Sequence, residues 1–206
     1  MNTNIYSQKT DKSEKLKRLQ LTLGKKGIKS SPKTNILKRN SEAPTRLSFA
    51  QQRLWFLDQL ESEGAQYNIV TAYLLKGVLN QKALEQSFNE IVKRHEILST
   101  VFVENDGEPF QNIAPFSTIV ITTSDLSGLS EPQQQSESRR IIKQEGRKRF
   151  RLDKGSLFKV RLIRLGEREQ ILLLIVHHIV ADGWSIKLLY KELRLSIHGC
   201  TTVHFI

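Results

Sequence analysis

Two adjacent histidines, His177 and His178, follow an apolar stretch directly, and Asp182 and Gly183 come after three further residues. Histidine accepts and returns a proton near neutral pH, so this pair is the strongest candidate for acid–base chemistry in the chain. Residues 170–176 (QILLLIV) predict a strand that is buried on both faces. Neighbouring side chains on a strand point to opposite faces, so one histidine should face a cleft while the other packs inward.

The residues after the pair are expected to hold it in place. Asp182 lies on the predicted loop and can turn back to fix it, and Gly183 permits a backbone angle or a close approach that a Cβ would block. Three other interpretations stay open: a hydrogen-bonded core pair, a metal site, and an ordinary Asp-Gly turn. The metal site is a weak interpretation, because adjacent histidines on a strand diverge and no third ligand is evident.

The elements that must position these residues begin at recognisable caps. Ser48 is a helix N-cap candidate, with Gln51 where a capping-box partner would lie, and the helix should run to Leu60. Its apolar face is predicted to consist of Leu54, Trp55, Phe56, Leu57 and Leu60. Asn80 caps a second predicted helix, in which Leu84, Phe88, Ile91, Val92 and His95 recur at helical spacing.

The remaining elements are mostly strands. They are predicted at residues 68–78, 99–104, 119–123, 157–165 and 170–176, with a hairpin turn at Asp106-Gly107. A polar helix is expected between residues 131 and 150, and another helix from about Trp184. This mixture, without strict alternation, predicts an α/β fold layered around a mixed sheet.

Charge is distributed unevenly along the 206 residues, whose net charge is +11. Residues 1–46 hold 12 basic and 3 acidic side chains, and the other 160 residues hold 20 and 18. A basic tail beside a nearly neutral body argues against a nucleic-acid-binding fold and favours a flexible leader or a segment that docks an acidic partner. No apolar run is long enough for a transmembrane helix or a secretory signal, and the single cysteine, Cys200, suits a reducing cytoplasm.

Four segments stand in a fixed order along the chain: residues 47–57 (LSFAQQRLWFL), 94–102 (RHEILSTVF), 150–161 (FRLDKGSLFKVR) and 177–185 (HHIVADGWS). Together they resemble the motifs SxAQxR(L/M)(W/Y)xL, RHExLRTxF, FDLxxGPLxRxxL and HHxxxDG of nonribosomal peptide synthetase condensation domains. The resemblance covers roughly residues 46–193. Three positions depart from the pattern: Ser99 replaces an arginine, Arg151 an aspartate, and Ala181 a common serine.

The resemblance implies a fold and a role for each site residue. The fold would be the N-terminal lobe of a chloramphenicol-acetyltransferase-like, mixed-sheet sandwich, with a tunnel between two lobes. His178 would orient the attacking amine or take its proton, and His177 would be structural. Asp182 would form an ion pair with Arg94, and the Gly183 N–H would face the developing oxyanion. Trp184 and Ser185 would begin the next helix and are candidates for the substrate channel; no metal is expected.

The implied activity is amide-bond formation between carrier-bound aminoacyl or peptidyl thioesters. The domain would bind no cofactor itself, because its substrates hang on phosphopantetheine arms of carrier domains; an adenylation domain would be a neighbour. We expect a cytoplasmic protein without nucleic-acid or membrane partners. The chain would divide into a basic leader (1–46), an incomplete N-terminal lobe (47–194) and a divergent tail (195–206) left by a frameshift or early stop. Such a truncated chain should have little activity alone. The alternatives are a coenzyme A-dependent acyltransferase of the same superfamily and a non-catalytic docking module.

Overall fold

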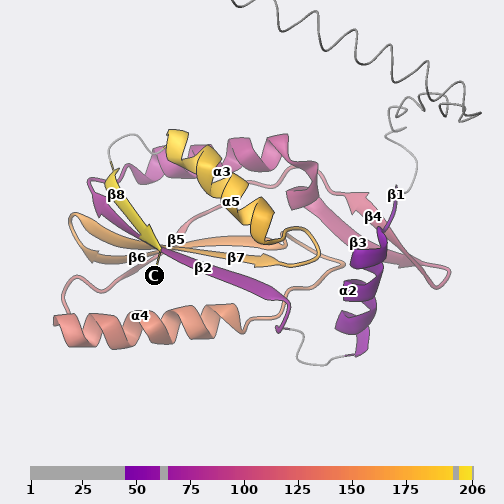
Figure 1. Ribbon diagram of the computed structural model, residues 1–206, viewed down its shortest axis with the longest axis horizontal. Helices are drawn as coiled ribbons and strands as arrows, with labels where there is room; N and C mark the ends of the chain where they lie inside the picture. The colour runs from indigo at the N-terminus through magenta and orange to yellow at the C-terminus, as the bar shows by residue number, and fades with distance from the viewer. Residues whose placement is uncertain (1–44, 61–64, 197–199, 206) are drawn as a thin grey trace, which may run out of the picture. The chain divides into compact units, whose positions relative to one another are not determined.

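The computed structural model describes residues 45–60, 65–196 and 200–205, and its larger sheet is mixed, as the sequence predicts (Figure 1). Five strands form this sheet in the order β5-β6-β7-β2-β8. They are β2 (Asn68–Gly77), β5 (Thr122–Asp125), β6 (Phe158–Gly166), β7 (Glu169–His177) and β8 (Cys200–Phe205). The β5–β6 pair is parallel and the other pairs are antiparallel.

Helices cover both faces of this sheet, which gives the layered arrangement in Figure 1. Helices α3 (Gln81–Arg94) and α5 (Gly183–Ser196) lie on one face, and α4 (Glu131–Gly146) lies on the other. The central strand β7 is buried from Ile171 to His177. A strand that is enclosed on both faces has little freedom to move, so its carboxyl end is a rigid support for the residues that follow.

A smaller sheet has the order β1-β4-β3. Its strands are β1 (Thr45–Arg46), β3 (Thr100–Asn105) and β4 (Glu108–Ile113); a short 3₁₀ helix, η1 (Glu96–Ser99), precedes β3. Asp106 and Gly107 join β3 to β4 with φ values of 52° and 81°. Two consecutive positive φ angles are what a tight hairpin turn of this type needs, so the predicted turn is confirmed.

Both predicted helix caps are present. In α2 (Phe49–Leu60), the Gln51 N–H donates to Ser48 Oγ at 3.3 Å and the Ser48 N–H donates to Gln51 Oε1 at 3.0 Å. Asn80 Oδ1 accepts from the Ala83 N–H at 3.1 Å at the start of α3. Each cap satisfies N–H groups that the first turn of a helix leaves without a partner.

Several boundaries differ from the predictions. The sequence places residues 45–46 in the leader, but they form β1 and pair with β4. The strand expected at 119–123 is β5, at 122–125, and α4 ends at Gly146 rather than near residue 150. Asn68, at the start of β2, binds this end of α4: its Nδ2 donates to the Gly146 carbonyl at 2.8 Å and to the Lys148 carbonyl at 3.0 Å.

Two other predictions concern the ends of the chain. The rest of the basic leader, residues 1–44, lies outside the described residues. In the tail, where the sequence diverges from the family pattern, β8 pairs antiparallel with β2 along its edge, from Tyr73 to Gly77. None of the helices in the described part of the chain has both the length and the apolar character needed to cross a membrane.

Candidate active site

His177 is the last residue of β7 and is completely buried. Its Nδ1 accepts from the Ile179 N–H at 3.2 Å, which fixes the turn that follows the strand. The rings of Tyr67 and Phe150 pack edge-on against the imidazole, each with its centroid 6.3 Å away. His177 is therefore the histidine of the pair that packs inward, and the alternation of the strand predicts that one of the two does so.

Burial also sets the charge of His177. Loss of solvent lowers the pKa of this imidazole to about 4, and the neighbouring His178 contributes to the same shift. The ring of His177 is thus neutral at pH 7. Its Nε2 is buried without a hydrogen-bond partner in the described part of the chain, and protonation would add an unsolvated charge there.

His178 is the one exposed side chain in the run from residue 171 to residue 180. Its backbone N–H donates to the Tyr67 carbonyl at 2.8 Å, which extends the β2–β7 pairing by one step. Ile179 and Val180, directly after it, are only 3% and 6% exposed. The histidine is therefore presented to solvent by a turn whose neighbours on both sides are anchored in the core.

A contact from α2 adds to this anchoring. Gln51 Nε2 donates to the Ile179 carbonyl at 3.3 Å. This bond links the first motif segment, residues 47–57, to the turn at residues 177–180, which we call the histidine turn. Gln51 caps α2 with its Oε1, so one side chain holds both the start of a helix and the turn. The sequence predicts the cap but not the contact with Ile179, because residues 128 positions apart leave no local signal.

Asp182 caps α5, and the ion pair predicted for it is absent. Its Oδ1 accepts from the Ser185 N–H at 2.8 Å and from Ser185 Oγ at 2.7 Å, the position of an N-cap side chain. These hydrogen bonds lower the pKa of Asp182 below its ordinary value. Arg94 instead donates to Glu192 Oε2 at 3.2 Å, so the predicted Asp182–Arg94 pair is wrong.

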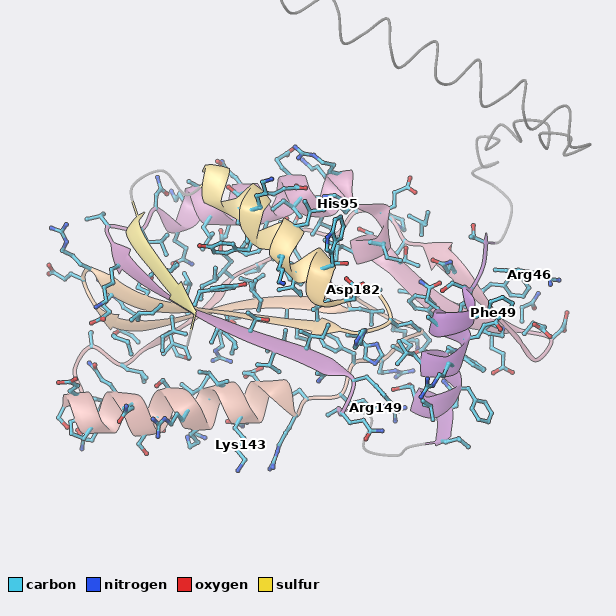
Figure 2. The ribbon with its side chains drawn as sticks, in the orientation of Figure 1. Arg46, Phe49, His95, Lys143, Arg149 and Asp182 are labelled. Carbon is cyan, nitrogen blue, oxygen red and sulfur yellow. The ribbon has the colours of Figure 1, made fainter. Side chains whose placement is uncertain are left out.

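Glu192 joins α3 to α5, a role that the sequence analysis missed. Besides Arg94, it contacts His95, whose Nε2 lies 3.1 Å from Glu192 Oε1. Figure 2 shows Asp182 at the start of α5 and His95 beside the same helix. The carboxylate therefore ties the end of α3, in the second motif segment, to the helix that follows the histidine turn.

Gly183 and Trp184 begin α5 on its exposed side. Apart from its chain neighbours and the backbone of its own helix, a Cβ at Gly183 would meet no atom of the described residues within 4 Å, and φ is not positive there. The close approach predicted for Gly183 is therefore not made by the described residues themselves. Trp184 is 72% exposed, so its indole lies at the surface in the first turn of the helix.

An apolar cavity of about 120 Å³ lies beside the histidine turn. Its lining is His95, Ile97, Leu98, Phe158, Val176, Val180, Ala181, Ser185, Ile186, Leu188 and Leu189. The lining joins the second motif segment to the loop and helix after His178. Among the described residues, no group of three or more His, Cys, Asp or Glu side chains is arranged to hold a metal ion.

Comparison with known proteins gives consistent matches. A family described as "Condensation domain" matches residues 41–197. One polypeptide of the linear gramicidin synthase of Brevibacillus parabrevis is 45% identical over 147 residues, which are 71% of this chain and 3% of that protein. Another polypeptide of the same synthase is 40% identical over 183 residues, or 88% of this chain and 4% of that protein.

Solved structures match the same region. The first condensation domain of the calcium-dependent antibiotic synthetase, in complex with a substrate analogue, is 28% identical with a TM-score of 0.67. The match covers 74% of this chain and 36% of that one. The starter condensation domain of rhizomide synthetase is 22% identical with a TM-score of 0.68, which shows the shared fold. This chain thus spans only a small part of its curated relatives and about a third of these solved chains.

Proposed function

The chain belongs to the condensation-domain family, and from this premise we propose that it supplies the catalytic histidine of a peptide-bond-forming site. The observation that carries the proposal is the setting of His178. It alone is exposed between residues 171 and 180, while His177, Ile179 and Val180 are buried around it. A histidine held this firmly and facing solvent suits proton transfer to a bound substrate.

The proposed reaction is acyl transfer from sulfur to nitrogen. The amine of one aminoacyl thioester attacks the thioester carbonyl of another, the new C–N bond forms, and the C–S bond breaks to release a thiol. His178 accepts the proton that the amine loses or orients that amine for attack. His177 is neutral at pH 7, so it places no charge beside the reacting groups.

The residues around His178 take supporting roles in this proposal. His177 and Gln51 hold the turn, and Asp182 with Ser185 fixes the start of α5. The Gly183 N–H, in the first turn of that helix, would face the oxyanion that forms on the attacked carbonyl. Asp182 caps the helix in this proposal and has no role in the chemistry; its Oδ1 accepts from both Ser185 donors.

The partners follow from the chemistry of the substrates. Both thioesters would be carried on phosphopantetheine arms of carrier domains, with an adenylation domain next to them in the synthetase; the condensation domain itself would bind no cofactor. The match of this chain to 3–4% of very long synthetase polypeptides supports such neighbours. We propose a cytoplasmic location, without nucleic-acid or membrane partners.

Alone, residues 41–197 would provide one wall of the site. The second wall would come from the other lobe that the family resemblance implies, and positioning of two substrates supplies much of the rate in such a transfer. We therefore expect the 206-residue chain to show little or no turnover with carrier-loaded substrates. Turnover by the purified chain that His178→Ala abolishes would contradict this expectation.

The proposed function is tested in a chimera. Residues 45–196 replace the matching segment in a condensation domain of the linear gramicidin synthase polypeptide that is 45% identical to this chain, and amide formation from two loaded carriers is measured. We expect the chimera to form the amide and His178→Ala to slow it by about 10²–10⁴-fold. Glu104→Ala, at an exposed position in β3, is the control and should leave the rate unchanged. A folded chimera whose rate is the same with and without His178 would sink the proposal.

A further inference from the structure

The cavity beside the histidine turn has the character of a site for an aliphatic group. Of its lining residues, Ser185 and His95 are the polar ones. Ser185 donates its hydroxyl proton to Asp182, and His95 Nε2 faces Glu192. The Ser185 hydroxyl proton and His95 Nε2 thus already have polar partners, so a polar or charged group placed in the cavity would lose its hydration without gaining them.

The cavity is open to the surface on the side of α5. Leu188, at its edge, is 37% exposed, whereas Ile186 and Leu189 of the same helix are only 8% exposed each. Ala181 and Ser185 are partly exposed at the start of the helix. Leu188 is therefore the most exposed of the α5 leucine and isoleucine side chains in the lining, and it is the expected point of entry for a ligand.

Its position relates it to His178. Val180 and Ala181, which line the cavity, are the second and third residues after that histidine. They belong to the turn that Gln51 and His177 hold in place. The wall of the cavity and the exposed imidazole are thus parts of one rigid loop. A group bound in the cavity is fixed relative to His178.

We propose that this cavity binds the aliphatic side chain or acyl chain of a thioester substrate of the site at His178. The inference rests on the proposed function and adds the class of substrate. An apolar protein cavity of ~150 Å³ accommodates benzene, so a volume of about 120 Å³ fits an aliphatic group of about four or five carbons. Aromatic and charged substrate groups are disfavoured, the first by size and the second by the apolar lining.

The test uses the 206-residue chain and synthetic N-acetylcysteamine thioesters with acyl chains of increasing length. Binding is followed by methyl NMR signals of Val180, Ile186 and Leu189. We expect the affinity to rise about fourfold for each added methylene until the chain reaches about five carbons, and then to level off. Shifts at these methyls that do not depend on chain length would overturn the proposal.

Leu188 and Leu129 offer a matched pair of variants, because their exposed fractions are 37% and 40%. Leu188→Trp should close the entrance and weaken binding at least tenfold, whereas Leu129→Trp, outside the cavity lining, should leave it unchanged. Leu188→Ala should move the preferred length upward by about two or three carbons, because it removes that much side chain. Leu188→Ala tests the proposal even if Leu188→Trp does not fold. An unchanged preferred acyl-chain length in Leu188→Ala would refute binding in this cavity.

The two proposals fail in different ways. A chimera that forms amide bonds with no preference for acyl length would remove the cavity proposal and leave the catalytic role of His178 intact. Length-dependent binding to the chain, together with a chimera that forms no amide, would remove the catalytic proposal and leave an aliphatic binding site.

Discussion

His177→Asn should flatten the pH dependence of the stability of the chain between pH 7 and pH 5. Burial lowers the pKa of His177 from an ordinary value of 6.5 to about 4. The unfolded chain therefore takes up a proton on this residue as the pH falls below about 6.5, while the folded chain does not. Its contribution to the free energy of unfolding is full above pH 7 and is lost progressively as the pH falls toward 4.

The size of the effect follows from the two pKa values. The difference between 6.5 and about 4 corresponds to a maximum of about 3 kcal/mol. Between pH 7 and pH 5 about 2 kcal/mol of this is lost, because the unfolded form is almost fully protonated at pH 5 and the folded form is not. That is a large share of the ~5–15 kcal/mol by which most domains are stable.

The assay is urea-induced unfolding at pH 7, 6 and 5, followed by tryptophan fluorescence. Asparagine keeps an oxygen near the position of Nδ1, which accepts from the Ile179 N–H, but it does not titrate. Above pH 5 most Asp and Glu side chains are already ionised, so they contribute little to the difference between the variants. His178→Asn, at an exposed position, is the control, and its free energy of unfolding should depend on pH nearly as that of the wild type does. If the free energy of unfolding of His177→Asn falls as much between pH 7 and pH 5 as that of the wild type, burial of a neutral His177 does not explain the pH dependence.

Two further predictions concern packing on the α4 side of the sheet. Arg149→Met should lower the free energy of unfolding by about 2 kcal/mol in urea titrations. The reason is that the carboxylate of Asp58, which is 3% exposed, loses its Nη2 partner at 3.1 Å. Adding Asp58→Asn to this variant should recover part of the lost stability, and no recovery would contradict the ion-pair explanation. Gly146→Ala should lower the free energy of unfolding by about 1–3 kcal/mol, since the new Cβ would lie 2.8 Å from Val70 Cγ2. Val70→Ala should remove most of this loss. An equal loss with valine and with alanine at position 70 would show that the contact is not the cause.

Features with a local cause are predicted well from the sequence. The Ser48–Gln51 cap, the Asn80 cap and the Asp106-Gly107 turn each depend on residues within four positions of one another. The alternation in residues 157–165 and the apolar run in 170–176 identify β6 and β7, because burial against two neighbouring layers leaves its pattern in the sequence itself.

The environment of α2 could not be predicted in the same way. The periodicity of residues 49–60 predicts an apolar face that includes Phe56 and Leu60, yet these side chains are 57% and 66% exposed. Phe49, at the start of the helix, is 90% exposed. Periodicity shows which side chains share a face of a helix, but it does not show which other element, if any, covers that face.

The site shows the same division between local and distant causes. Strand alternation correctly separates the buried His177 from the exposed His178. The partner predicted for Arg94 is wrong, because which of several carboxylates it meets depends on how α3 packs against α5. Glu192 carries no signal at all, since a glutamate near the end of a predicted helix is ordinarily a solvated residue.

The Asp182 cap does not involve Ser99, where the second segment departs from the motif that it resembles. Ser99 stands where the motif that the second segment resembles has an arginine. The Asp182 carboxylate nevertheless has its donors, because both hydrogen bonds come from Ser185 within the same turn. These bonds also lower the pKa of Asp182 below its ordinary value. The start of α5 is therefore determined inside the motif itself. The turn that carries His178 is held by the buried residues on either side of it and by the hydrogen bond from Gln51.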